Sequence, residues 1–424
     1  MVRYGLPSGE TSRNVVGEIM NSAPLDRSAS LPSRVASVDL IRGAVMVLMA
    51  VDHVRVYSGV PAGGPTPGLF FTRWVTHFCA PAFIFLAGSS AFFYARKHAD
   101  LSQHLLVRGL WLIFLEFTYL RLCWTFNLDF KHYEMAGVIW VIGICMILMA
   151  GLVKLPLPAV GAIGIIIIAT HNLMDSHLGE LLEGLDQNKF SGLWKIFYIG
   201  FFAGPIQFGP DGPNLIVLYS IIPWIGVMAA GYAFGKILSL PAAARNRLCL
   251  QIGLSAIALF FLLRGFNLYG DPRPWHAATQ GRNGMPPMPA YLSFLNTSKY
   301  PASLDFLLMT LGPIIALIPL LENAKGTLVR AITAFGRVPF FYYMLHIPLI
   351  HALALIVSKI RLGYVSPWLF ANHPMGNPEA PDGYMWSLPL LYLVWAMAIT
   401  LLYFPCRWFA GFKSRRNDWW LTYL

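Results

Sequence analysis

The sequence predicts an all-α, polytopic membrane protein with about ten transmembrane helices and both termini in the cytoplasm. Of its 424 residues, 56% are hydrophobic and only 12% are charged, whereas soluble domains average about 25% charged residues. The mean hydropathy is +0.57, and apolar runs of about 20 residues recur along the chain. Because lipid cannot satisfy exposed backbone N–H and C=O groups, such runs are expected to cross the bilayer as helices.

The predicted helices follow from the length and hydropathy of the apolar runs, taken in order. Residues 193–209, "LWKIFYIGFFAGPIQFG", are not counted as a span, because their Gly and Pro content favours a re-entrant or interfacial segment. The fifth run is short. The predicted spans are residues 38–57, 69–94, 105–125, 136–153, 157–173, 214–237, 249–268, 302–321, 329–357 and 386–408.

The two ends of the chain are predicted to lie on the cytoplasmic side of a membrane domain at residues 37–410. Residues 1–36 are polar and rich in Ser, Arg and Pro, which predicts a disordered tail with no cleaved signal peptide. Residues 411–424 form a short C-terminal tail. Lys and Arg gather beside the predicted inner helix ends, so the positive-inside rule accounts for the net charge of +11 without a nucleic-acid partner.

Cysteine spacing predicts neither a disulfide framework nor a set of paired metal ligands. The five cysteines stand singly in apolar segments, where we expect them to act as buried small hydrophobic residues. His171 and Asp175 are four residues apart, which fits a pair or half of a metal site on one helical face, and equally fits the capping of a helix end. We expect no bound metal.

Ionisable residues gather near the predicted outer ends of the helices. Because a charged residue in a membrane is unfavourable unless it is paired or hydrated, each is a candidate functional residue. The connection at residues 270–301 is long enough to be a lid or a substrate-binding segment. The candidates for substrate binding are Arg73, Asn267, Asp271, Lys299 and Asp305, and the candidates for catalysis are Asp52, His53, His77 and His346.

Each of these residues also has a structural interpretation. Arginines near the membrane surface, such as Arg73, commonly extend toward the interface. Asp271 lies in "GDP", a sequence typical of a turn. A histidine buried in a bilayer needs hydrogen-bond partners and could simply join two helices. Because His53, His77 and His346 lie at similar predicted depth, we expect at least one of them to be functional.

Arg42 and His53 are predicted to lie on one face of the first helix. Eleven residues at about 100° each return to nearly the same face, about 16 Å further along the axis. The two side chains could therefore line one tunnel with a basic inner end. The alternative is that Arg42 is a cytoplasmic anchor paired with Asp39, three residues earlier.

Several strings, in order along the chain, resemble those of a known family. "SVDLIRGAVMVLMAVDHVR" and "THFCAPAFIFLAGSSAFF" are similar to the opening of the heparan-alpha-glucosaminide N-acetyltransferase catalytic-domain family. "IPWIGVMAAGYAFG", "LYGDPRPW", "SKYPASLDFLLMTLGP" and "FGRVPFFYYMLHIPL" resemble its bacterial branch. The resemblance covers almost everything after residue 36, and it implies a transmembrane acyltransferase in a bacterial inner membrane.

The lysosomal members of that family carry acetyl from cytosolic acetyl-CoA to the amine of a terminal glucosamine on the luminal side. The resemblance therefore implies cytoplasmic acetyl-CoA or another acyl-CoA as co-substrate and a small-molecule or glycan acceptor on the far side. Arg34 and Arg42 are the candidates for binding the CoA end. Membrane lipids are expected partners, and a homo-oligomer is left open. The lysosomal enzymes are associated with a histidine in the loop between the first two helices, whereas residues 54–76 here contain none.

Acyl transfer needs a base that accepts the proton of the acceptor and donors that stabilise the oxyanion. His53 is the predicted base, because an imidazole titrates near neutral pH. His77 or His346 is the alternative base or the oxyanion donor. Asp52 or Asp305 is the predicted orienting carboxylate. Neighbours on a helix diverge by about 100°, which favours a carboxylate from elsewhere than Asp52.

Two other functions fit the same residues. A secondary transporter or flippase would use buried histidines and carboxylates to relay protons or ligands, and it predicts helices broken at the bilayer centre. A non-catalytic family member would retain the fold alone. Loss of His53 would then leave activity and phenotype unchanged.

Overall fold

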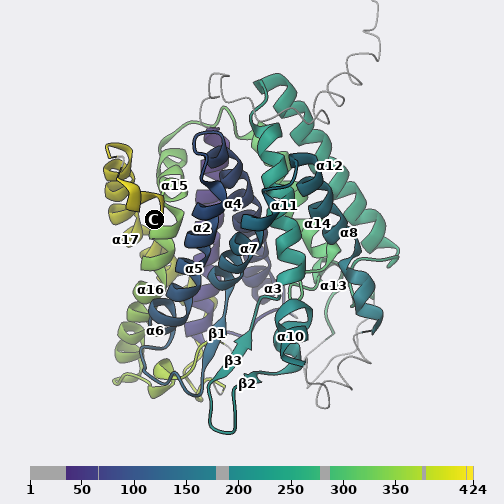
Figure 1. The fold of residues 1–424 in the computed structure, drawn as a ribbon. Helices are drawn as coiled ribbons and strands as arrows, with labels where there is room; N and C mark the ends of the chain where they lie inside the picture. The colour runs from purple at the N-terminus through teal and green to yellow at the C-terminus, as the bar shows by residue number, and fades with distance from the viewer. Residues whose placement is uncertain are drawn as a thin grey trace, which may run out of the picture.

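The computed structural model describes residues 35–423 apart from 65, 178–190, 277–286, 375–378 and 417. The tail predicted at residues 1–36 lies almost entirely outside the described residues. The described chain is mostly helical, and its long helices run side by side as a bundle (Figure 1). The α-helices are α2 (Ala36–Ser58), α3 (Pro67–Trp74), α4 (Cys79–Ala95), α5 (Leu101–Leu115), α6 (Arg121–Thr125), α7 (Val138–Leu152), α8 (Leu157–Thr170), α10 (Ser191–Trp194), α11 (Ile221–Leu238), α12 (Ala242–Gly265), α13 (Ala290–Leu295), α14 (Leu304–Leu320), α15 (Thr327–Arg337), α16 (Pro339–Leu362) and α17 (Leu388–Ser414).

Short 3-10 and π turns extend or join several of these helices. The π turn η2 (Glu116–Leu120) links α5 and α6 into one run, and the 3-10 turn η1 (Val75–Phe78) links α3 and α4. A π turn inside a helix inserts an extra residue and often marks a functional site. The remaining turns are η3 (His171–His177), η5 (Lys195–Ile199), η6 (Gly200–Ala203), η7 (Pro367–Phe370) and η8 (Trp419–Thr422).

Within the described part of the chain, six helical runs are long and apolar enough to cross a membrane, which makes the protein an integral membrane protein. α2 is also long, at 23 residues, but it carries four charged side chains. α7 and α14 are apolar and shorter. The ten crossings and the side of each terminus remain predictions. The six runs are Pro67–Ala95, Leu157–Asp175, Ile221–Leu238, Ala242–Gly265, Pro339–Leu362 and Leu388–Ser414.

Two predicted spans have the wrong boundaries. The span predicted at residues 329–357 is two helices, α15 and α16, separated at Val338, whose φ of −133° and ψ of 52° are not helical. Pro339 explains the break, because proline disfavours the helical conformation of the residue before it. The span predicted at residues 214–237 begins instead as a strand, since Asn214–Val217 pairs with two other strands before α11 starts.

A three-stranded sheet lies at one end of the bundle (Figure 1). β3 (Asn214–Val217) pairs in parallel with β1 (Glu134–Ala136) and antiparallel with β2 (Ile206–Gln207). β1 leads into α7 and β3 leads into α11, so the sheet ties the first turns of these two helices together. Residues 193–209 comprise the end of α10, η5, η6 and β2, and no continuous helix crosses that segment, because the helical run breaks at Gly200.

The opposite end of the bundle collects basic side chains. Arg245, in the first turn of α12, pairs with Glu322, just after α14. Arg42 donates to Ser90 Oγ at 3.2 Å, and Arg108 donates to the Thr422 carbonyl. The Arg42 contact joins the start of α2 to α4, and the Arg108 contact joins the middle of α5 to the C-terminal residues.

Close helix crossings at glycine hold the bundle together. At the α4–α11 crossing, a Cβ on Gly231 would lie 2.0 Å from the Phe85 carbonyl oxygen, and one on Gly88 would lie 2.1 Å from the Met228 carbonyl oxygen. Ser89 Oγ donates to the Gly231 carbonyl at 2.8 Å across the same contact. Small residues allow the two backbones to approach this closely, which is how helices associate in lipid without a hydrophobic driving force.

Replacing Gly231 by alanine is expected to destabilise the protein by roughly 1–3 kcal/mol, because the new methyl group meets backbone that cannot move aside. This effect opposes, and should exceed, the higher intrinsic helix propensity of alanine. Gly151→Ala in α7 is the matched control, since a Cβ there meets nothing within 4 Å. Thermal unfolding of the two purified variants in detergent measures the difference. Equal melting temperatures would show that the α4–α11 crossing relaxes more easily than its geometry indicates.

The loop between α12 and α14 is held by a buried polar cluster. Asp271 accepts hydrogen bonds from the Ser298 backbone N–H at 2.6 Å, Ser298 Oγ at 2.8 Å and Ser303 Oγ at 2.9 Å. Arg264, at the end of α12, donates to the carbonyls of Phe294, Arg273, Ser293 and Asn296 and lies 3.9 Å from Asp271. This cluster fixes the backbone on both sides of Lys299.

Candidate active site

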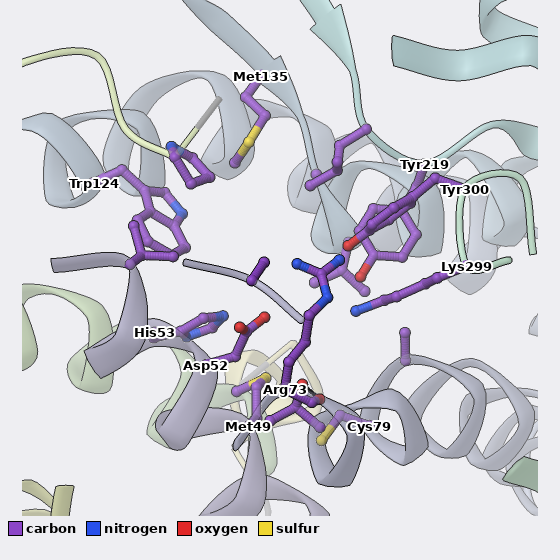
Figure 2. Close-up of a pocket in the computed structure, with 18 of the residues that line it drawn as sticks. Met49, Asp52, His53, Arg73, Cys79, Trp124, Met135, Tyr219, Lys299 and Tyr300 are labelled. Atoms are coloured by element: carbon purple, nitrogen blue, oxygen red, sulfur yellow. Dashed lines mark hydrogen bonds between the residues drawn. The ribbon is translucent and has the colours of Figure 1, made fainter. Parts of the chain in front are cut away.

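A cavity of about 320 Å³ opens among the helix ends beside the sheet. Its walls come from α2, α4, the η2–α6 run, the sheet, the loop before α14, and α16 (Figure 2). Met49, Cys79, Ala80 and Phe83 form an apolar wall toward the middle of the bundle. The charged residues of the lining are Asp52, Arg55, Arg73, Glu116 and Lys299. A cavity of this size with one apolar wall and a few polar groups suits a small ligand.

Asp52 lies in the last two turns of α2 and is paired with a neighbour on its own helix. Its carboxylate accepts from Arg55 Nε at 2.7 Å, and Arg55 also donates to the Val60 carbonyl at 3.0 Å. Arg73 and Lys299 lie within electrostatic range of the same carboxylate. Asp52 therefore organises the charges of the cavity. The carboxylate makes its hydrogen bond to Arg55, and the partner of His53 Nδ1 is His346 instead of the predicted Asp52.

His53 is oriented by a second histidine. Its Nδ1 lies 2.6 Å from His346 Nε2, and His346 Nδ1 lies 2.7 Å from the Tyr343 carbonyl oxygen. A carbonyl oxygen only accepts, so His346 Nδ1 carries the proton and, in the neutral ring, its Nε2 is the acceptor. His53 Nδ1 must then be the donor. The lone pair of His53 is left on Nε2, which forms no hydrogen bond to any described residue.

His346 reaches the cavity only through His53. It is fully buried, it is not part of the cavity lining, and its ring stacks between those of His53 and Tyr342 at centroid distances of 4.8 and 5.2 Å. Trp124 contacts the His53 ring by its edge, at 4.9 Å. The geometry therefore makes His346 a positioning residue, and the prediction of His346 as an alternative base is corrected, because its ring has no face on the cavity.

His77 lies behind the charged wall. The side chain is buried against Phe306, with a centroid distance of 5.4 Å, and is within electrostatic range of Arg73, Lys299 and Asp52. Neither ring nitrogen has a hydrogen-bond partner among the described residues. His77 is not part of the cavity lining. His77 therefore remains a predicted alternative to His53 as the catalytic imidazole.

Two cations, Arg73 and Lys299, and two tyrosines, Tyr219 and Tyr300, lie close together in the cavity lining (Figure 2). The Lys299 ammonium lies 5.2 Å from the ring centre of Tyr300 and 5.8 Å from that of Tyr219. Burial, together with the neighbouring Tyr300, holds the pKa of Tyr219 well above its ordinary value. Tyr219 precedes α11, outside the spans, and its hydroxyl therefore stays protonated and able to donate.

Glu116 is a cavity residue that the sequence reasoning missed. It opens the π turn η2, and its Oε2 accepts from the Trp140 backbone N–H at 3.0 Å, in the first turn of α7. A carboxylate at a helix N-terminus satisfies N–H groups that have no partner within the helix. The signal was available, because Glu116 is the one acidic residue in the apolar run 105–125. Tyr219, Tyr300 and Trp124 carried no such signal.

Three predicted substrate-binding residues do not line the cavity. Asp271 is the acceptor at the centre of the loop cluster. Asn267 bonds the backbone N–H and carbonyl of Trp275 at 3.0 and 3.1 Å. Asp305 is buried at the start of α14, and its Oδ1 has no partner among the described residues. These residues shape the loop that carries Lys299, so of the five predicted binding residues only Arg73 and Lys299 face the cavity. Asp305 is likewise corrected as the carboxylate orienting His53.

The predicted CoA-binding residues lie away from the cavity. Arg34 falls outside the described residues. Arg42 lies at the far end of α2 from His53, where it pairs with Asp39 at 3.4 Å, as the anchor interpretation predicted. The helix between them packs tightly, since Met46, Met49 and Ala50 are buried. The cavity lining includes no residue of α2 before Met49.

The apolar bundle and the charged cavity at its helix ends define an integral membrane protein with a buried polar site. The chain belongs to the heparan-alpha-glucosaminide N-acetyltransferase catalytic family, whose model matches residues 34–265. This membership confirms the resemblance and supports a membrane acetyltransferase-like function. No curated protein matches the chain.

The matched region and the cavity overlap only in part. Asp52, His53, Arg73 and Glu116 lie within residues 34–265. Lys299, Tyr300 and the histidine that orients His53 lie beyond it. The likeness of the later strings to the bacterial branch therefore stays a prediction.

Proposed function

We propose that this protein transfers an acetyl group from acetyl-CoA, or another acyl-CoA, to an amine or hydroxyl of a glycan-like acceptor within the cavity. The observation that carries the proposal is the state of His53. The chain His53, His346 and the Tyr343 carbonyl leaves an unprotonated Nε2 in a cavity residue. An imidazole nitrogen in this state is what a general base requires.

The proposed reaction balances with the residues on the cavity wall. His53 Nε2 takes the proton of the acceptor as the acceptor nitrogen or oxygen bonds to the acetyl carbonyl carbon. The carbon–sulfur bond breaks, and the proton passes from His53 to the leaving thiolate. The apolar wall of Met49, Cys79, Ala80 and Phe83 suits the acyl group, and the protonated hydroxyl of Tyr219 is a donor for the developing oxyanion.

The proposal also includes the membrane side. With the N-terminus in the cytoplasm, α2 brings His53 to the extracytoplasmic end, so the acceptor would be modified on the far side of a bacterial inner membrane. The basic end of the bundle would then face the cytoplasm, in agreement with the positive-inside rule.

The test is an acetyl-transfer assay on membranes. Membranes that contain the protein, and vector-only membranes, are incubated with radiolabelled acetyl-CoA and an extract of cell-envelope glycans. We expect label in the glycan fraction only with the protein. Equal labelling across several acyl donors would overturn the proposal, and uptake of unmodified solute into proteoliposomes would favour the transporter alternative.

Replacing His346 by phenylalanine is expected to lower kcat roughly 10- to 100-fold with little change in KM, because residues behind a functional imidazole fix its tautomer and orientation. His346→Gln supplies an amide oxygen that can accept from His53 Nδ1, so it should retain most of the rate. The comparison is made by measuring kcat and its pH profile for the Phe and Gln variants. A Gln variant as slow as the Phe variant would show that His346 serves packing alone.

A further inference from the structure

The cavity wall has more cationic than anionic side chains. It carries three cations, Arg55, Arg73 and Lys299, and two carboxylates, Asp52 and Glu116. Arg55 is bonded to Asp52 at 2.7 Å. Among the described residues, no carboxylate lies within ion-pair distance of Arg73 or Lys299, and neither side chain makes a hydrogen bond.

The two carboxylates are already engaged. Glu116 accepts the Trp140 backbone N–H at 3.0 Å, at the start of α7. Asp52 is within electrostatic range of all three cations, so one carboxylate serves Arg55, Arg73 and Lys299 together. No described group of the wall is left to neutralise the second and third cations.

Lys299 would be costly to keep in this position for packing alone. Its side chain is 8% exposed, and its nearest described partners are the faces of Tyr219 and Tyr300. Tyrosine faces attract a cation more weakly than a carboxylate does. Burying a charge without a full partner is unfavourable, so an anion bound beside the Lys299 ammonium would stabilise that buried charge.

The fold nevertheless holds both cations in defined places. The Asp271 cluster fixes Ser298, directly before Lys299, and Lys299 bridges to Ala302 by its backbone. Arg73 lies in the last turn of α3, and its carbonyl accepts from Thr76 Oγ1 at 2.6 Å. Figure 2 shows the guanidinium and the ammonium directed into the same space, between Asp52 and His53 on one side and the two tyrosines on the other.

We propose that Arg73 and Lys299 form a subsite for an acidic group of the acceptor, and that the acceptor is therefore an acidic sugar bearing a carboxylate or phosphate. A planar guanidinium binds either group by two parallel hydrogen bonds, and an ammonium adds a point charge. Tyr219 and Tyr300 supply hydroxyl donors and flat faces for a sugar ring. The role of this acidic sugar as the acetyl acceptor rests on the proposed function, whereas its binding to Arg73 and Lys299 does not.

The test compares three ligands that share one ring. Glucose, glucuronate and glucose 6-phosphate are titrated into the purified full-length protein in detergent by isothermal calorimetry. We expect at least one acid to bind tenfold or more tightly than glucose. Lys299→Met and Arg73→Gln should each remove at least tenfold of that affinity, while Lys299→Arg retains it. Lys131→Gln, an exposed lysine outside the cavity lining, is the matched control.

The melting temperature separates a binding role from a structural one. Removing a buried cation that has no full partner should raise the melting temperature of Lys299→Met by roughly 1–4 °C without ligand. A fall in melting temperature with unchanged affinity for the acids would overturn the proposal. Equal affinity for glucose and both acids would overturn it as well.

Coenzyme A is the other source of phosphate, and it forms the last arm of the test. If the two substitutions weaken coenzyme A binding as much as they weaken sugar-acid binding, the anion belongs to the donor and the acceptor assignment is wrong. Acid binding that depends on Arg73 and Lys299, in a protein that transfers no acetyl group, would leave the subsite standing and remove only the proposed function.

Discussion

His53→Ala is expected to lower kcat for acetyl transfer by roughly 10²- to 10⁴-fold, the usual contribution of a general base. The reason is geometric. His53 is the one histidine on the cavity lining in the described chain, and its Nδ1 is committed to His346 at 2.6 Å. The proton of the acceptor can therefore be taken only by Nε2. Initial rates with radiolabelled acetyl-CoA at several acceptor concentrations would measure kcat and KM separately.

The control for this substitution is His132→Ala. His132 is exposed near the sheet and pairs with Asp129 at 2.8 Å, away from the cavity, so its loss should leave the rate unchanged. His53→Gln reports on folding, because it keeps a donor toward His346. If His53→Ala retains a rate within threefold of the wild type, the base lies elsewhere, and His77, buried beside the cation wall, is the next residue to replace.

Arg264→Leu is expected to lower the free energy of unfolding by about 3–5 kcal/mol, the range for breaking a buried ion pair by removing one partner. The guanidinium is buried, donates to four backbone carbonyls, and lies 3.9 Å from the buried carboxylate of Asp271. Its loss leaves that carboxylate without a cation and the loop carbonyls without donors. Thermal unfolding in detergent, read by circular dichroism, measures the change.

A double substitution tests the cause. Arg264→Leu combined with Asp271→Asn removes the uncompensated charge, so it should be less destabilising than the sum of the single substitutions. Arg416→Leu is the contrasting control, since the Arg416–Asp418 pair is exposed and should contribute no more than about 1 kcal/mol. Strict additivity of the two buried substitutions would show that Arg264 and Asp271 act independently.

The long apolar runs made most of the fold predictable. Lipid imposes helices on any such run, so hydropathy places α4, α11 and α17 without knowledge of their neighbours. Two span boundaries were predicted wrongly. One depends on a local proline rule that was not applied, and the other depends on strands that are distant in the sequence. Pro339 should have divided the run at 329–357, whereas Asn214–Val217 becomes a strand only because β1 and β2 lie beside it.

Most of the charged cavity residues could be predicted individually from the sequence, but the contacts between them could not. The rule that charge within a membrane marks function selects Asp52, His53, Arg73 and Lys299, and it would have selected Glu116 too. The partner of His53 was expected to be a carboxylate and is His346, which is 293 residues away in the sequence. Asp271 and Asn267 look equally functional in the sequence, whereas the structure gives them hydrogen bonds within the loop and no place on the cavity lining.

The pairing of His53 with His346 also ties the chemistry to the synthesis of the chain. α2 emerges early from the ribosome, and α16 is made some 280 residues later, so a nascent chain that ends at α14 already holds most of the cavity wall but lacks the acceptor for His53 Nδ1. In such a chain the His53 ring has no fixed tautomer. Under the proposed function, the base is therefore complete only when α16 has been inserted.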